Sequence, residues 1–403
     1  MFDFNPLSPE FQSNPYQYYN LLLEHMPMFY WDKWNMWFFS RYEDCSAVLR
    51  NNHFGHEFAA TMSEEERAML PTAPPEQKAL WDMQRHWMLL KDPPSHTRLR
   101  MLVHKAFTPR TVEQLRVYIQ RITDELIDGV QGAGRMDLIE DLAFPLPVTV
   151  ISELLGIAQA DREQVRLWSR DLAVSLEFIE EAEPYNRASV ATEAFDHYLR
   201  GLIAEHRAHP REDLISALVA AEEAGDKLTE DEMIATIMLL FIAGHETTVN
   251  LIGNGTLALL RNPAQFDRLK ADPALVKNAL EELLRYDSPV QITTRITLQD
   301  TEINGQAIKR GQSVATMLGA ANRDPRTFAN PDQLDITRGN AAQHIGFGNG
   351  IHYCLGAPLA RLEAEIAFGT LLRRLPKLAL GTDDPVYRGT YVLRGMKHFP
   401  VVF

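Results

Sequence analysis

The chain has 403 residues, of which 45% are hydrophobic and 23% charged, a composition that can bury a large core and excludes disorder throughout. Its formal net charge of -14 argues against non-specific binding to nucleic acid, whose phosphates require a basic surface. Two cysteines, Cys45 and Cys354, are too few for a framework of several disulfides and predict a reducing, cytoplasmic compartment. The first residues, MFDFNPLSPEF, lack the cationic start and apolar run of a signal peptide or membrane anchor, so we expect neither.

The first half of the chain predicts a small hairpin followed by many helices. Strand-like residues 29–31 and 36–39 flank a turn at 32–35, and a short helix follows at 42–50. From 94 to 224, one amphipathic pattern follows another with few strand signals. We therefore expect an early small sheet and a helical middle.

One very long helix is predicted next. Thr229 and Glu232 have the S/T-x-x-E spacing of a capping box, and the apolar helix that they open continues to about Arg261. At about 1.5 Å per residue, this helix is roughly 48 Å long and crosses a whole domain. Its most apolar stretch, Met238 to Ala243, is soon interrupted by Glu246, which predicts a buried helix rather than a membrane span.

The last third of the chain predicts a second small sheet and a further helix. Strand-like runs within 292–314 alternate with turns at 304–305 and 310–311. A helix at 358–374 precedes a strand and turn at 391–403. The expected fold class is mainly α with small β-sheets. The domain prediction is one domain, residues 1–403, with β-rich portions at about 27–40, 290–320 and 377–403.

A glycine-rich loop surrounds Cys354. Residues 344–358, HIGFGNGIHYCLGAP, place three glycines before the cysteine and the predicted helix directly after it. Glycine permits close backbone approach and positive φ, so N–H groups can point at the sulfur, and a helix N-terminus favours the thiolate. A stabilised thiolate is a soft ligand suited to iron.

Three other interpretations of this loop fit less well. A buried structural role is usual for a lone cysteine, and Cys45, in a short helix without glycines, is expected to have it. Zinc needs a second ligand pair beside His352 and Cys354. The order of Gly346, Gly348 and Gly350 differs from the G-x-G-x-x-G of a dinucleotide loop.

Residues 347–356, FGNGIHYCLG, resemble the haem-binding signature of the cytochrome P450 monooxygenases. The resemblance extends over nearly the full chain and implies a cytochrome P450 fold, with the long helix beside the haem. It implies haem b as the cofactor, with Cys354 as the axial metal ligand, Phe347 near the sulfur and His352 bonded to a propionate. The cofactor-binding residues that it implies in this loop are Phe347, Gly348, His352, Cys354 and Gly356.

The centre of the long helix departs from helix propensity. Residues 241–249, FIAGHETTV, place a glycine, an acid and a run of three β-branched residues at 247–249 among apolar neighbours. Glycine costs about 1 kcal/mol relative to alanine here, and such violations tend to mark functional sites. Thr247 can turn its hydroxyl onto the carbonyl of Ala243 and loosen one turn. The alternatives are a kinked helix with an incidental acid, and a zinc-protease helix, which fails because Val249 replaces the second histidine of H-E-x-x-H.

This segment also resembles the family's oxygen-activation motif, in which an acid and an alcohol relay protons. The resemblance implies catalytic roles for Glu246 and Thr247, and places Ala243 and Gly244 against the haem. Cleavage of the O–O bond needs protons delivered by ordered groups rather than by bulk water. Family members that work mainly with peroxide usually lack this pair, so its presence favours dioxygen as the oxidant.

Charged residues elsewhere gain a meaning from the same resemblance. Glu282 and Arg285, three apart on a predicted helix, by themselves indicate an exposed pair contributing about 0.2–0.5 kcal/mol. The resemblance makes them, with Arg338, a structural triad behind the haem. It also implies that three residues bind the haem propionates, although each by itself would be interpreted as exposed to solvent. These residues are His96, Arg100 and Arg295.

The function implied is a bacterial-type haem-thiolate monooxygenase that inserts one oxygen atom from O2 into an apolar substrate, by C–H hydroxylation or epoxidation. The chain has no flavin or iron–sulfur motif, so electrons are expected from a separate ferredoxin with its reductase. The partner is expected to dock on the face near Cys354, where Arg361 and Arg373 add positive charge. The alternatives are a peroxide-using or isomerising haem-thiolate enzyme, and a non-catalytic haem-based sensor or ligand-binding protein.

The expected substrate is a small lipophilic molecule such as a terpenoid, steroid, fatty acid or macrolide, because the segments expected around the haem are apolar. We expect a monomer with neither a nucleic-acid ligand nor a membrane anchor. The residues expected to line the substrate pocket are Trp87, Ala243, Val290, Gln291 and Ile292.

Overall fold

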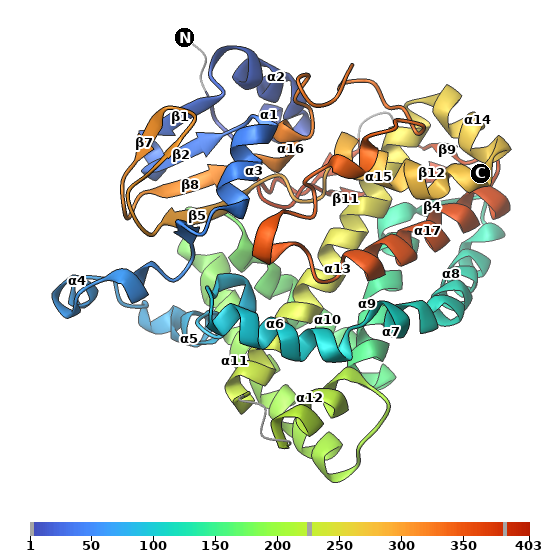
Figure 1. Ribbon diagram of the computed structural model, residues 1–403. Coiled ribbons are helices and arrows are strands. Elements are labelled where there is room, and N and C mark those ends of the chain that lie inside the picture. The colour runs from blue at the N-terminus through green and yellow to red at the C-terminus, as the bar shows by residue number, and fades with distance from the viewer. Residues whose placement is uncertain (1–3, 224–227, 382–384) are drawn as a thin grey trace. The chain divides into compact units, whose positions relative to one another are not determined.

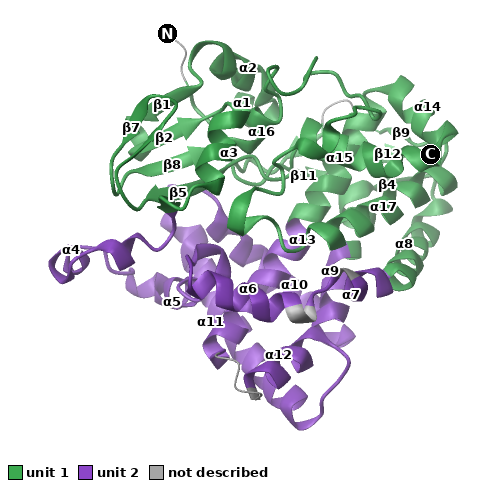
Figure 2. Ribbon diagram, viewed as in Figure 1, with its two compact units in different colours: residues 1–54, 116–146, 247–403 green, residues 55–115, 147–246 purple. Residues whose placement is uncertain are grey.

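The computed structural model of the chain describes residues 4–223, 228–381 and 385–403, without the side chains of residues 105, 106, 109 and 223. Helices contain 60% of the residues and strands 10%, which confirms the predicted fold class (Figure 1). The chain divides into two compact units, and Figure 2 colours them separately: unit 1 comprises residues 1–54, 116–146 and 247–403, and unit 2 comprises residues 55–115 and 147–246. The segments of the units alternate along the chain, so neither unit is one continuous stretch of sequence.

Unit 1 combines helices with most of the strands. Its helices are α1 (Pro9–Ser13), α2 (Tyr16–His25), α3 (Tyr42–Arg50), α8 (Arg116–Gln131), α14 (Pro263–Ala271), α15 (Val276–Tyr286), α16 (Leu318–Ala321) and α17 (Ala357–Arg374), with the short 3-10 helix η10 (Gly350–His352) before α17. Its strands are β1 (Met28–Trp31), β2 (Met36–Phe39), β4 (Arg135–Asp137), β5 (Thr293–Thr297), β6 (Thr301–Ile303), β7 (Gln306–Ile308), β8 (Ser313–Thr316), β9 (Ala379–Leu380), β10 (Val386–Tyr387), β11 (Met396–His398) and β12 (Pro400–Val402).

Unit 2 is built from helices. They are α4 (Glu64–Ala68), α5 (Lys78–Gln84), α6 (Ser95–Ala106), α7 (Pro109–Gln114), α10 (Arg162–Ala173), α11 (Ala182–Ala208) and α12 (Leu214–Glu223). Three further elements have residues in both units: β3 (Phe54–Gly55), α9 (Pro145–Leu155) and α13 (Glu230–Leu260).

The largest sheet joins strands from opposite ends of the sequence. Its order is β1-β2-β8-β5-β3, with the predicted hairpin of β1 and β2 at one edge. Strand β8 pairs in parallel with β2, Val314 lying opposite Trp37, and antiparallel with β5. The prediction of a separate second sheet is therefore wrong for β5 and β8, because their partner strand lies more than half the chain away and leaves no local signal.

Two short strands fall outside the β-rich portions expected from the sequence. Strand β3 is one edge of the large sheet, and β4 pairs with β12 near the C-terminus. Strands of two or three residues are too short to show an alternating pattern. Residues 382–384, inside the β-rich portion expected at 377–403, lie outside the described residues.

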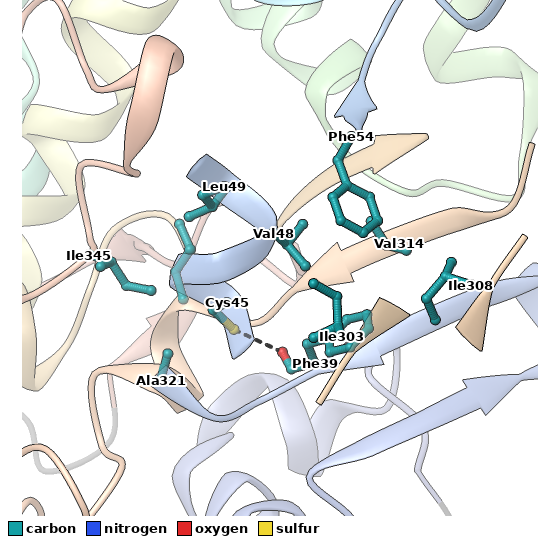
Figure 3. Packing of buried hydrophobic residues seen from close by; sticks show 11 residues of the cluster. Phe39, Cys45, Val48, Leu49, Phe54, Ile303, Ile308, Val314, Ala321 and Ile345 are labelled. Atoms are coloured by element: carbon teal, nitrogen blue, oxygen red, sulfur yellow. Dashed lines mark hydrogen bonds between the residues drawn. The ribbon is translucent and has the colours of Figure 1, made fainter. Parts of the chain in front are cut away.

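Helix α3 packs against the large sheet in unit 1. Figure 3 shows Cys45, Val48 and Leu49 of this helix among the buried side chains of Phe39 and Val314. The Cys45 thiol donates to the Phe39 carbonyl oxygen at 3.2 Å, and burial raises the pKa of that thiol far above its ordinary value. The buried structural role expected for Cys45 is confirmed.

Helix α13 begins at the predicted capping box. The Glu232 N–H donates to Thr229 Oγ1 at 3.2 Å, and the Thr229 N–H donates to Glu232 Oε2 at 3.0 Å. The helix continues without a break to Leu260, one residue before the predicted end. It is long and apolar enough to cross a membrane, but 78% of its most apolar window is buried inside the protein, as expected for a core helix.

Candidate active site

The loop that carries Cys354 is closed by its own backbone. The Cys354 N–H donates to the Phe347 carbonyl oxygen at 2.9 Å, and α17 begins shortly after the cysteine. Gly348 and Gly350 have φ of 73° and 68°, in the left-handed region. A Cβ at Gly350 would lie 2.2 Å from the Leu49 carbonyl oxygen, so this position also requires glycine for close packing. The Cys354 side chain is partly exposed, in contrast to the buried Cys45.

Glu282, Arg285 and Arg338 meet inside unit 1. Arg285 Nε and Nη2 lie 2.7 and 2.9 Å from the two Glu282 carboxylate oxygens, and Arg338 Nε lies 3.0 Å from Glu282 Oε2. Glu282 and Arg285 have no exposed surface, which contradicts the exposed pair that their spacing alone indicated. Removal of one partner would leave a buried charge without compensation, a change that costs about 3–5 kcal/mol in other proteins.

Other predicted residues of unit 1 are buried to different degrees. Arg295, on β5, is 6% exposed and donates from Nη1 to the Thr294 carbonyl oxygen at 2.7 Å. His352 belongs to η10 and is partly buried. Of the expected pocket residues, Ile292 is buried and Val290 partly buried.

Gln291, also expected to line the pocket, is fixed within the packing of unit 1. Its Nε2 donates to the Ser288 carbonyl oxygen at 2.6 Å, and its Oε1 accepts from the Tyr19 hydroxyl at 2.8 Å. Gly319 approaches so closely that a Cβ there would lie 2.2 Å from the same Oε1. The amide of Gln291 therefore holds α2 and α16 in place, a role that the sequence did not indicate.

Helix α6 carries two predicted residues in unit 2. His96 is 2% exposed, and Arg100, about one helical turn later, is partly buried. Between them, Arg98 binds Glu232 of α13 with an Nη1–Oε2 distance of 3.0 Å, which fixes α6 against the first turn of α13. Trp87, expected to line the pocket, is 1% exposed.

The centre of α13 has an unusual pattern of exposure. Ala243 is exposed and Gly244 and Thr247 are partly exposed, although the neighbouring Ile242 and Glu246 are buried. Residues at these spacings lie on one face of a helix, so this face presents small side chains. A flat cofactor can approach the backbone over such a face, and these residues therefore fit the haem that the sequence implies. The bond expected from the Thr247 hydroxyl to the Ala243 carbonyl stays a prediction.

Two buried acids, Glu246 of α13 and Glu363 of α17, have different neighbours. In unit 2, Glu246 is 5% exposed and its Oε2 lies 3.8 Å from Nε2 of His245, whose Nδ1 lies 2.7 Å from the Phe241 carbonyl oxygen. In unit 1, Glu363 of α17 is 1% exposed, and burial raises the pKa of its carboxyl to about 8, opposed in part by the Thr248 hydroxyl. Sequence reasoning missed Glu363, although an acid within an apolar helical stretch was a visible signal.

The positive charges expected near Cys354 are not equivalent. Arg361 binds Glu281, with an Nε–Oε1 distance of 2.6 Å, and is 33% exposed. Arg373 is 63% exposed and lies 3.4 Å from Asp124. The charge of Arg361 is thus balanced within the protein, which weakens the expectation that it serves a partner.

Comparisons with known proteins identify the family. The sequence model of the cytochrome P450 family matches residues 73–385. The polyketide biosynthesis cytochrome P450 PksS of Bacillus subtilis is 42% identical over 407 aligned positions, which cover 99% of this chain and 98% of the relative. The vitamin D(3) 25-hydroxylase of Pseudonocardia autotrophica is 42% identical over 370 positions, which cover 91% of this chain and 87% of the relative.

A solved structure supports the same family. The crystal structure of P450BioI in complex with an acyl carrier protein ligated to hexadec-9Z-enoic acid is 40% identical, with a TM-score of 0.91 over 98% of this chain and 100% of that chain. The chain belongs to the cytochrome P450 family. It is a haem-thiolate monooxygenase, which confirms the predicted fold and class of enzyme.

Proposed function

We propose that the protein inserts one oxygen atom from O2 into an apolar organic substrate, by C–H hydroxylation or epoxidation, with haem b bound through Cys354. The observation that carries the proposal is the loop of Cys354, whose thiol is partly exposed and whose backbone N–H donates to the Phe347 carbonyl just before the N-terminus of α17. The helix N-terminus favours the thiolate form. When bound, the haem supplies the oxygen-activating chemistry, and a thiolate ligand favours O–O cleavage.

The residues proposed to hold the cofactor have complementary chemistry. Arg100 and Arg295 offer guanidinium groups, which bind carboxylates through charge-assisted hydrogen bonds, and His96 and His352 offer ring nitrogens. The glycines of the cysteine loop allow close approach of the backbone. The remaining proposed contacts are Phe347, Gly348, Gly356, Ala243 and Gly244.

Glu246 and Thr247 are proposed to hold and pass protons. The Glu246 carboxylate is nearly buried, so bulk water does not compete freely with its proton transfers, and Thr247 is partly exposed on the small-residue face of α13. A hydroxyl both accepts and donates a hydrogen bond, so Thr247 can take a proton at Oγ1 while it releases its own.

Substitution of Cys354 tests the proposed ligand. Cys354→Ser keeps the size of the side chain but removes the soft thiolate, so the reduced carbon monoxide complex is expected to lose its thiolate-type spectrum. The measurement is the absorption spectrum of protein expressed with ample haem. Cys45→Ser is the matched control and is expected to keep that spectrum, because Cys45 is buried in the packing of α3 against the large sheet and donates to the Phe39 carbonyl. An unchanged spectrum in Cys354→Ser rules out Cys354 as the ligand.

The substrate is proposed to be lipophilic, in keeping with terpenoids, steroids, fatty acids or macrolides. Two relatives of about 40% identity are named for polyketide biosynthesis and for a complex with an acyl-loaded carrier protein, which favours a long acyl chain, free or carrier-bound. Titration with hexadecenoic acid, the same acid on a carrier protein, and a steroid is expected to shift the haem spectrum most strongly with an acyl compound. A shift with the steroid alone rejects the acyl proposal.

The electrons are proposed to come from a ferredoxin and its reductase. The protein itself is proposed to be monomeric and cytoplasmic, with residues 1–403 acting as one domain. The negative net charge of -14 makes an exposed arginine such as Arg373 valuable for an acidic partner. Arg373→Glu is expected to slow reduction by the ferredoxin at low ionic strength and to have less effect at high salt.

A further inference from the structure

A network of charged side chains lies beside the loop of Cys354 in unit 1, where α15 and α17 pack together. Arg361 of α17 forms two hydrogen bonds with Glu281 of α15: Nε lies 2.6 Å from Oε1, and Nη2 lies 3.0 Å from Oε2. His344 Nε2 lies 3.1 Å from the same Oε2. The Gly346 N–H donates to His344 Nδ1 at 3.0 Å, so the ring carries its hydrogen on Nε2 and donates it to Glu281.

The Glu281 carboxylate is ionised in this network. Burial by itself would raise the pKa of the carboxyl, but the hydrogen bonds from His344 and Arg361 lower the pKa to about 2. At neutral pH, Glu281 and Arg361 therefore form one negative and one positive charge whose fields largely cancel at a distance. Replacement of either residue by a neutral one leaves the other charge uncompensated.

The network contacts the side chains of Phe347 and Tyr353 in the cysteine loop. The Arg361 guanidinium carbon lies 4.6 Å from the centre of the Phe347 ring, and the His344 ring centre lies 5.6 Å from it. Arg361 Nη1 also donates to the Tyr353 hydroxyl at 3.3 Å. Phe347 supplies the carbonyl that accepts the Cys354 N–H, and Tyr353 precedes the cysteine in the chain.

We propose that Glu281, His344 and Arg361 are positioning residues that hold Phe347 and Tyr353 in place and keep the charge beside Cys354 balanced, and thereby set the reduction potential of the bound haem. The inference rests on the proposed ligation of haem by Cys354. It separates Glu281 from the adjacent Glu282, whose carboxylate binds Arg285 and Arg338 instead.

The reduction potential of the holoprotein, measured by spectroelectrochemistry without substrate or partner, tests this role. Glu281→Gln leaves Arg361 uncompensated, and because a positive charge favours the addition of an electron, the potential is expected to rise. Arg361→Gln leaves Glu281 uncompensated, and the potential is expected to fall. The double variant removes both charges and is expected to return towards the value of the original protein.

Two further variants separate charge from simple loosening of the loop. Arg361→Lys keeps the charge and is expected to stay closer to the original potential than Arg361→Gln. Arg373→Gln, the matched control on the same helix, is expected to leave the potential unchanged, because its side chain lies largely in solvent.

Shifts of the same sign in Glu281→Gln and Arg361→Gln, or no shift in either, overturn the inference, since a merely structural role gives both variants the same defect. If Glu281→Gln fails to bind haem, the comparison of Arg361→Lys with Arg361→Gln takes its place. Equal reduction potentials in these two variants overturn the inference, because only Arg361→Lys keeps the positive charge. If the unsubstituted protein itself shows no thiolate-type carbon monoxide spectrum, the proposed ligand Cys354 is rejected instead.

Discussion

The carboxyl group of Glu363 on α17 is buried, and its environment favours the protonated form. Its pKa rises from an ordinary value of 4.5 to about 8 because of burial, with the Thr248 hydroxyl acting in the opposite direction. Between these two values the folded protein keeps a proton that the unfolded chain releases. The contribution of Glu363 to stability therefore falls as pH rises through this range and is least unfavourable below pH 4.5.

Glu363→Gln is expected to stabilise the protein near neutral pH, because glutamine resembles the neutral acid and has no charge to release. The difference from the original protein is about 3 kcal/mol at pH 7 as an upper estimate, and it shrinks as pH falls towards 5. Thermal unfolding midpoints of both holoproteins across this pH range provide the measurement. A stability gain that does not depend on pH would contradict a buried neutral carboxyl.

The proposed role of Thr247 also depends on a single group, the hydroxyl that is proposed to pass a proton. Thr247→Ala is expected to bind haem and substrate normally but to divert reducing equivalents to hydrogen peroxide, because the side chain can no longer pass a proton. The measurement compares product and peroxide formed per NAD(P)H consumed. Thr247→Ser, which retains the hydroxyl, is the control and is expected to remain better coupled. Tight coupling in Thr247→Ala would contradict the proposed relay.

At the scale of an element, α13 is closely packed in its second half. A Cβ at Gly255 would lie 2.7 Å from Phe368 Cζ of α17 and 3.1 Å from Leu283 Cδ1 of α15. Both contacts lie within unit 1 and involve side chains of its core. Glycine is thus required at this position by its neighbours, although it lowers helix propensity.

Two Gly→Ala substitutions separate these effects. Gly255→Ala is expected to destabilise the protein, because overpacking costs about 1–3 kcal/mol and exceeds the propensity gain of up to about 1 kcal/mol. Gly369→Ala in α17 meets nothing within 4 Å, so it is expected to stabilise by up to about 1 kcal/mol. Denaturant unfolding followed by circular dichroism measures both. Stabilisation by Gly255→Ala would show that the core of unit 1 relaxes at no cost.

At the scale of the whole molecule, the oxidant and the need for electrons distinguish the proposed reaction from its alternatives. Product formation is expected to require both O2 and a source of electrons, and to be weak with hydrogen peroxide alone, because Glu246 and Thr247 are proposed to supply the protons that O2 activation needs. Incubation with labelled O2 and reductant, or with peroxide under nitrogen, measures this requirement. Equal rates with peroxide alone favour a peroxygenase, and binding without any product favours a sensor.

Much of the chain was predictable because its signals are local. The capping box of α13, the hairpin of β1 and β2, and the glycines beside Cys354 all depend on residues close in sequence, and the structure describes each as expected. The motifs around Cys354 and Glu246 also indicated the family, because a rare residue pattern at fixed spacing is specific in itself. The proposed cofactor roles of individual residues remain predictions.

Tertiary structure decided what depends on distant partners. Pairing of β8 with β2 merged two expected sheets, and the partners of Glu282 turned an apparently exposed pair into a buried triad. The raised pKa of Glu363 and the pairing of Arg361 with Glu281 likewise follow from neighbours supplied by other elements. Sequence spacing sets which residues share a helix face or a turn, but burial and charge balance depend on packing that only the folded chain brings together.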